Sequence, residues 1–422
     1  MGTPLSTNAR LLVAGQAVRG LGYGFTAVVL GSLLASKGVS PERAGVLLAV
    51  LIGGSAAASL VVGAFGDRFG RRRSYGLFFV GISVAGAVVA TNPPLWVLFI
   101  VALTGTLSTD VVDNGAATTL EQVMLAREDA GTGRVYGWYN AYGASFGALG
   151  SLGAVVAGAS SNARGAHAWL FAALVPVGLV GLYCARGLSA TVEADPAASD
   201  AQGRSKRSRV KLGPSRRVVH HLAALFSVDA AGGGLVTTGF LSYYLSSRYG
   251  ATLATLGWLF FAVSVLQAAS VLVAPVLAKR FGLIATMVGT HLPSNVLLGA
   301  MAFAPSFAWA ALLLLVRTTL SQMDVPTRQA LVMSVTTPAE HTAAAAATNA
   351  ARYSVRPFAP LLGGLLQSIS LGTPLLVAGV VKGSYDVALW RWAHRTLARD
   401  VNGPLGATRS SSGESEEGQS SA

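Results

Sequence analysis

The chain has 422 residues, of which 52% are hydrophobic and 12% are charged. Soluble globular domains carry about a quarter charged residues, so this composition excludes an ordinary soluble domain and indicates a membrane protein. The net charge is +13, and the basic residues lie in loops. They form no basic face with aromatic or groove-reading elements, which excludes nucleic acid as the main partner.

Apolar segments follow one another along the chain, each long enough to cross a hydrocarbon core of about 30 Å. The start, Met1–Arg10, is short and polar and leads directly into the first segment, so we expect an uncleaved anchor. The pattern predicts an all-α integral membrane protein with spans near 11–35, 44–65, 74–91, 95–114, 135–158, 168–186, 218–246, 254–278, 283–304, 308–328, 345–370 and 373–392.

Two hydrophilic segments divide the chain. One contains the basic stretch Arg204–Lys211, and the other is rich in Ser, Gly and Glu. They predict an N-terminal six-helix bundle, a flexible cytoplasmic linker, a C-terminal six-helix bundle and a disordered cytoplasmic tail at residues 1–186, 187–217, 218–400 and 401–422. Lys and Arg are concentrated in loops on the same side as the linker, so we expect both termini in the cytoplasm.

An internal repeat relates the two sets of spans. A shift of about 210 residues places Arg68-Phe69-Gly70 on Arg280-Phe281-Gly282 and Asp113 on Asp324. A shared offset across corresponding loops indicates duplication of a six-helix unit, an arrangement typical of transporters whose site lies between the halves.

The loop between the second and third spans reads Gly-Ala-Phe-Gly-Asp-Arg-Phe-Gly-Arg-Arg-Arg from residue 63. It resembles the signature G-x-x-x-D-R-x-G-R-R of the major facilitator superfamily, and it matches every fixed position: Gly63, Asp67, Arg68, Gly70, Arg71 and Arg72. The resemblance implies a twelve-helix transporter of two pseudo-symmetric bundles, in which this loop is a gate element that stabilises one access state and does not bind substrate.

The residue types of this loop have physical reasons. Gly63 permits close helix approach, Gly70 suits a turn with positive φ, and Asp67 can interact with the N-terminal end of a neighbouring helix. The alternative, favoured for Arg73, is that the arginines only anchor the loop at the cytoplasmic face. The second-half copy, Ala278–Gly282, lacks the acidic residue, so a gate there must be weaker or built differently.

Ionisable residues within spans are costly and therefore candidates for function. Arg19 and Asp229 lie at similar depths in the first and seventh spans, and the repeat aligns them. The family resemblance places the first, fourth, seventh and tenth spans around a central cavity. We hypothesise that the two residues form a charge pair across this cavity, which substrate or a proton disrupts; a structural salt bridge is the alternative.

A second group of charges ends the fourth and tenth spans. Asp110 and Asp113 lie in one, and Arg317, Asp324 and Arg328 lie in the other. They are candidates for coupling protonation to opening, since a shielded carboxylate can take up a proton. The alternative is an inner gate of salt bridges that does not titrate.

Other charged or polar residues within spans favour structural interpretations. Lys382 and Asp386 stand four apart on one helix, so each is expected to satisfy the other. We expect Arg352 to anchor its helix end and His291 to be a packing residue.

The sequence offers little support for an enzyme. The stretch from Gly143 to Gly147 matches G-x-S-x-G, but it lies in a Gly-rich apolar helix without the strand-to-helix turn that a serine nucleophile requires. A lone Cys184 and the absence of zinc-ligand or nucleotide-binding patterns predict no metal and no cofactor, and we expect no enzymatic activity.

These features predict a bacterial transporter of the inner (plasma) membrane, with GC-rich bacterial origin suggested by abundant Arg, Ala and Gly. The leading hypothesis is proton-coupled efflux of a small amphipathic drug or metabolite by alternating access. Uptake of a small metabolite or organic anion, or coupling to another ion, is the main alternative, and a non-transporting membrane receptor or enzyme is a remote one. Expected partners are substrate, coupling ion and lipid bilayer, and a monomer can contain the whole pathway.

Overall fold

A computed structural model describes residues 5–109, 115–128, 134–159, 163–193, 213–337 and 340–401. These ranges contain helices and no strand. Eight helical segments are long and apolar enough to cross a membrane. The remaining predicted spans correspond to helices broken near their middle and to α18, Thr373–Val401.

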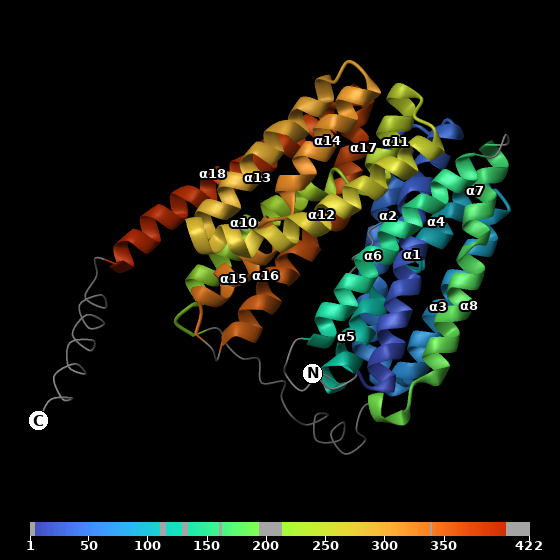
Figure 1. Ribbon diagram of the computed structural model, residues 1–422, viewed down its shortest axis with the longest axis horizontal. Coiled ribbons are helices and arrows are strands. Elements are labelled where there is room, and N and C mark those ends of the chain that lie inside the picture. The colour runs from blue at the N-terminus through green and yellow to red at the C-terminus, as the bar shows by residue number, and fades with distance from the viewer. Residues whose placement is uncertain are drawn as a thin grey trace, which may run out of the picture.

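The first half of the chain forms one bundle (Figure 1). Its helices, in chain order, are α1 Thr7–Ser36, α2 Pro41–Phe69, α3 Arg71–Ala90, α4 Leu95–Leu103, α5 Ala116–Glu128, α6 Arg134–Gly158, α7 Ala163–Ala172 and α8 Leu174–Gly187, followed by a 3-10 turn, Ala190–Val192.

The second half forms the other bundle. It contains α10 Arg216–Gly234, α11 Thr238–Tyr249, α12 Leu253–Phe281, α13 Leu283–Ala300, α14 Phe307–Ser321, α15 Asp324–Ser334, α16 His341–Val355, α17 Ala359–Ile369 and α18. Short 3-10 turns at Met301–Phe303 and Arg356–Phe358 follow α13 and α16. The predicted linker and tail fall mostly outside the described ranges.

The prediction of one continuous span at 95–114 was wrong. Helix α4 ends at Leu103, and α5 begins at Ala116. Gly105 has φ +68, and a Cβ at this position would lie 2.6 Å from the carbonyl oxygen of Gly54. The close approach of α2 and a left-handed backbone conformation therefore interrupt the helix at a position that hydropathy does not mark.

The internal repeat is visible in the backbone. Gly70 joins α2 to α3 with φ +89, and Gly282 joins α12 to α13 with φ +87. L-residues with side chains rarely adopt this conformation, so both loops require glycine for the same reason. The predicted positive φ at Gly70 is confirmed.

Large apolar side chains cover the outside of the bundles. Leu60, Val156, Leu272 and Ile369 are each at least 76% exposed. Exposure of this kind on several helices suits contact with lipid tails, whereas the charged side chains described below are buried.

The two bundles lie against each other around α11 and α12 and diverge toward the end of the molecule where the N-terminus lies (Figure 1). Small residues form the contact: Gly31 of α1 meets Gly239 of α11, and Gly45 of α2 meets Gly364 of α17. These positions lie near the ends predicted to face outward. With both termini in the cytoplasm, as the sequence predicts, the helices contact each other on the outer side and diverge toward the cytoplasmic side, as expected of an inward-facing transporter.

Candidate functional site

The gate loop is held within the first bundle. Asp67 Oδ1 accepts a hydrogen bond from Arg71 Nε at 2.6 Å, and the Asp67 side chain is 59% exposed. The N-terminus of α3 is occupied instead by Glu193, whose carboxylate oxygens accept from the backbone N–H groups of Arg71 at 2.7 Å and Arg72 at 3.2 Å. Asp67 thus pairs with an arginine side chain, while the carboxylate of Glu193 holds the start of α3.

Gly63 also differs from expectation in this conformation. A Cβ placed on it meets no atom of the described chain within 4 Å, so it permits no close helix approach here. Arg68 and Arg72 of the same loop line a recess at the cytoplasmic edge.

The first bundle contains a buried ion pair. Arg19 of α1 and Glu121 of α5 are 1% and 0% exposed, with 2.6 Å between Nη2 and Oε2. Tyr75 of α3 and Tyr139 of α6 each donate a hydrogen bond of 2.6 Å to the Glu121 carboxylate. Arg19 also donates to Thr118 Oγ1 at 3.0 Å. One glutamate thus ties four helices together, and the ion pair compensates both buried charges.

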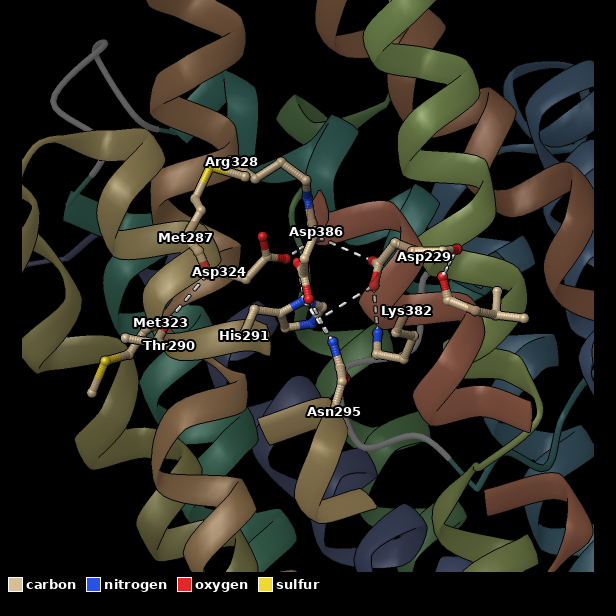
Figure 2. Close-up of polar contacts among 12 residues, drawn as sticks. Asp229, Met287, Thr290, His291, Asn295, Met323, Asp324, Arg328, Lys382 and Asp386 are labelled. Atoms are coloured by element: carbon tan, nitrogen blue, oxygen red, sulfur yellow. Dashed lines mark hydrogen bonds and ion pairs between the residues drawn. The ribbon is translucent and has the colours of Figure 1, made fainter. Parts of the chain in front are cut away.

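The second bundle contains a larger set, which we call the C-half polar cluster (Figure 2). Its members have buried or partly buried side chains that carry a charge, an imidazole or an amide, and they come from five helices. They are Asp229 of α10, His291 and Asn295 of α13, Asp324 and Arg328 of α15, Arg352 of α16, and Lys382 and Asp386 of α18.

Asp229 is the hub of this cluster. Lys382 Nζ donates to its Oδ1, while Arg328 and Arg352 place Nη1 atoms 3.5 and 3.6 Å from its Oδ2. Arg328 also pairs with Asp324. Three carboxylates therefore face three permanent cations, and this set is electrically balanced when His291 is neutral.

His291 lies between two of these carboxylates, as Figure 2 shows. Its Nδ1 is 2.8 Å from Asp386 Oδ1, and its Nε2 is 3.7 Å from Asp229 Oδ1. Asn295 donates to the other oxygen of Asp386 at 2.8 Å. The imidazole of His291 therefore lies between the carboxylates of Asp386 and Asp229.

The structure does not form the predicted Arg19–Asp229 charge pair. Each residue is paired within its own bundle, Arg19 with Glu121 and Asp229 with Lys382. Similar depth in two spans does not bring side chains together when each has a counter-ion inside its bundle.

The predicted Lys382–Asp386 pair is also replaced. Lys382 reaches Asp229, while Asp386 accepts from Asn295 and lies against His291. Arg352 does more than anchor a helix end, because it reaches the same Asp229.

The predicted cytoplasmic group of charges is only partly tested. Asp324 and Arg328 pair with each other and join Asp229. Arg317 lies on α14 with no ion pair to the described part of the chain, and its Nε has no hydrogen-bond partner there. Asp110 and Asp113 lie outside the described residues.

The sequence did not identify Glu121 as a site residue, because Thr118-Thr119 and Glu121-Gln122 interrupt the apolar run and resemble a loop. A signal did exist, since a buried Arg19 requires a carboxylate nearby.

Two helical bundles with a buried ionic cluster in each, covered by an apolar surface, define a multi-pass membrane transport protein. The chain belongs to the Major Facilitator Superfamily, whose family model matches residues 12–360. The fold predicted from the signature loop and the repeat is confirmed.

Known proteins share this fold at low sequence identity. The chain is 23% identical over 398 residues to the uncharacterized membrane protein YJR124C of Saccharomyces cerevisiae, covering 86% of this chain and 88% of the relative. It is similar to the crystal structure of the nucleoside transporter NupG, with TM-score 0.68, 12% identity and coverage of 90% and 97% of the two chains. A D-xylose-proton symporter structure gives TM-score 0.67, 16% identity and coverage of 90% and 97%.

Proposed function

We propose that this protein is a proton-coupled secondary transporter of the plasma membrane, which exports a small amphipathic organic compound as a monomer. The observation that carries the proposal is His291, placed between Asp386 and Asp229 inside a cluster that balances electrically without a charge on the imidazole. The proposal is that this site gains or loses one proton, on His291, during the transport cycle.

The proposed coupling step begins at His291. When Nδ1–H of His291 donates to Asp386, the Nε2 lone pair is free to take a proton beside Asp229. An imidazolium there competes with Lys382 for the Asp229 carboxylate. Weakening that ion pair loosens α10 from α18, so the proton changes the packing of helices on which alternating access depends.

The gate loop supplies the second part of the mechanism. Asp67 is exposed in the inward-facing arrangement, and within the described part of the chain its ion pair is with Arg71 of its own bundle. When the cytoplasmic ends approach, its carboxylate becomes available to the second bundle. Gly63, which meets nothing here, then has room for a close helix contact.

Uptake with protons is the second candidate, since one protein of similar fold is a D-xylose-proton symporter. The same His291 site serves either direction. The protein takes up its substrate if substrate and proton bind together, and it exports the substrate if they bind in alternation. A transport assay distinguishes the two cases.

Two vesicle assays test the proposal. Everted vesicles with wild-type protein are energised to acidify the lumen, and a panel of amphipathic compounds is added while luminal pH is followed. An exported compound raises the luminal pH because it exchanges for protons. In de-energised right-side-out vesicles, a compound taken up with protons instead raises the pH of the medium.

Vesicles carrying Asp67→Asn and vesicles without the protein are the controls. Compound-dependent pH changes should be absent without the protein and slowed in the variant. Compound flux that continues unchanged after the pH gradient is collapsed would overturn proton coupling, and compound-dependent pH changes only in right-side-out vesicles would overturn export in favour of uptake.

A further inference from the structure

A recess of about 830 Å³ lies at the cytoplasmic edge of the first bundle, between the start of α3 and the end of α8. Polar residues of the gate loop and of the segment after α8 form its mouth: Asp67, Arg68, Arg72, Arg73, Arg186 and Glu193. Its wall continues along the membrane-facing surface as Gly76, Leu77, Val80 and Leu182. The recess is therefore charged at one end and apolar at the other.

The charged end carries excess positive charge. Among the residues that the structure describes, no ion pair joins Arg68, Arg72, Arg73 or Arg186 to a carboxylate. The two carboxylates that line the recess are engaged elsewhere, because Asp67 holds Arg71 and Glu193 accepts from the backbone at the start of α3. Four arginines and two carboxylates line the recess, which leaves a formal net charge of +2 (four minus two) at its charged end.

Arg72 is partly fixed in this position. Its Nη2 donates to the carbonyl oxygen of Arg186 at 3.3 Å, which links α3 to the end of α8. Its Nε is buried without a hydrogen-bond partner in the described chain. A buried donor of this kind is costly unless an acceptor arrives, so the site favours an anion with several oxygen acceptors.

The apolar end faces lipid. Leu77 is 69% exposed and Val80 is 40% exposed on α3, and Tyr183, which follows Leu182 on α8, is 76% exposed. A free inorganic anion would gain nothing from this surface. A molecule with an anionic head and a hydrocarbon tail would use both ends.

We propose that this recess binds one anionic phospholipid of the cytoplasmic leaflet. Its phosphate oxygens accept from Arg72 and its neighbours Arg73 and Arg186, and an acyl chain lies along Leu77 and Val80. This proposal is independent of the transported compound and of proton coupling. Bound lipid would tie the gate loop to α8 and hold this edge of the first bundle together.

Native mass spectrometry of the purified protein tests the site. Phosphatidylglycerol is titrated against wild type and against Arg72→Gln/Arg186→Gln. Each arginine near a membrane surface contributes about 1 kcal/mol to binding anionic lipid, so the tightest bound lipid should be weakened at least about tenfold in the double variant. The matched control is Lys279→Gln/Arg280→Gln, which removes two cations from the corresponding loop of the second bundle.

Further arms identify the ligand. Phosphatidylcholine and glycerol 3-phosphate should each bind more weakly than phosphatidylglycerol, and Leu77→Ser should weaken the lipid but leave glycerol 3-phosphate unchanged. Should the double variant fail to fold, judged by gel filtration, Arg186→Gln alone carries the test. Equal binding of phosphatidylglycerol to variant and wild type, or equally tight binding of glycerol 3-phosphate, would overturn the proposal.

Discussion

His291 Nδ1 and Asp386 Oδ1 lie 2.8 Å apart, so an imidazole–carboxylate contact joins α13 to α18. Both helices are outside the set of spans that the family resemblance places around the central cavity. The proton site that we propose thus lies behind the cavity, within the second bundle. We expect protonation at this site to act on Asp229 of α10, a helix that the family resemblance places at the cavity.

Replacement of His291 by glutamine should separate transport from the proton gradient. The amide can still donate to Asp386, but it offers no basic nitrogen beside Asp229. We expect exchange of labelled for unlabelled substrate to persist. Accumulation driven by a pH gradient should fall at least about tenfold, which corresponds to a loss of about 1.4 kcal/mol in the coupling free energy between proton and substrate. Both are measured in proteoliposomes with a compound identified by the vesicle assay.

The matched control is His167→Gln, which alters a buried histidine of the first bundle that contacts Ser32 Oγ at 3.3 Å. It should leave gradient-driven accumulation intact. Full accumulation by His291→Gln would show that the coupling proton binds elsewhere.

Loss of Lys382 should destabilise the second bundle through Asp229. Removing one partner of a buried ion pair costs about 3–5 kcal/mol. Arg328 and Arg352 remain 3.5 and 3.6 Å from the same carboxylate, so we expect Lys382→Met to fall at the lower end of that range. Thermal unfolding in detergent, followed by the fluorescence of native tryptophans, measures the effect.

A double-mutant cycle with Asp229→Asn isolates this pair. The double variant should be more stable than the sum of the two single losses implies, because neither charge is then left alone. Strictly additive losses would mean that the two residues contribute independently.

The two tyrosine hydrogen bonds to Glu121 should each contribute less to stability than its ion pair with Arg19. Tyr75→Phe and Tyr139→Phe each remove one bond of 2.6 Å to a buried carboxylate, and bonds to charged groups contribute about 1.5–3 kcal/mol. Glu121→Gln should cost more than either, since it leaves Arg19 charged and buried without a carboxylate.

The same unfolding assay ranks these three variants, and Tyr183→Phe on the exposed surface of α8 is the comparison expected to change nothing. A glutamine variant as stable as wild type would show that the Arg19–Glu121 ion pair makes no net contribution to stability.

Glu340 predicts a pH dependence outside the membrane. Hydrogen bonds from Ser215 Oγ at 2.7 Å and Thr337 Oγ1 at 2.8 Å lower the pKa of its carboxyl below the usual range. A lowered pKa stabilises the folded state fully above the unfolded pKa of about 4.3, and this contribution disappears as pH falls through the folded value. We therefore expect stability to fall more steeply below about pH 4.3 in wild type than in Glu340→Gln.

Acid unfolding at fixed temperature measures the difference. Parallel curves for the two proteins would mean that Glu340 makes no net contribution to the end of the linker that it holds at Gly213 and Ser215.

Much of the fold follows from the sequence because the energetic signals are large and local. Runs of apolar residues mark the spans, and the glycines at 70 and 282 mark equivalent turns that require positive φ. The break at Gly105 is different. It depends on how closely α2 approaches, which is a property of packing and leaves no trace in hydropathy.

From the sequence, the site could be predicted only as a set of charged residues that are costly to bury in a membrane. Arg19, Asp229 and Asp324 stand out because charges in spans are costly, but their partners depend on helix rotation within each bundle. Spacing along one helix predicted that Lys382 would pair with Asp386. Both find closer partners on α10 and α13, since facing helices override neighbours four residues away.

Adding a single methyl group at Gly45 should weaken the outer contact between the bundles. A Cβ on Gly45 would lie 2.5 Å from the carbonyl oxygen of Pro360 and 2.6 Å from Gly364 Cα, and backbone atoms cannot rotate away. Gly45→Ala should therefore disfavour the inward-facing arrangement and raise the outward-facing population. The reporter is Leu48→Cys, a position 1% exposed at the same contact, in a chain whose native Cys184 is replaced by serine.

Labelling of this cysteine by a membrane-impermeant maleimide from the outside should accelerate at least about tenfold, which corresponds to a shift of about 1.4 kcal/mol between the two states. Gly289→Ala in α13 is the matched control, because a Cβ there meets no atom of the described chain within 4 Å. If Gly45→Ala labels no faster than this control, the Gly45–Gly364 contact is not what keeps the outer side closed, and other contacts between the bundles do so, among them the hydrogen bonds of Ser242 and Tyr243 to the backbone of the first bundle.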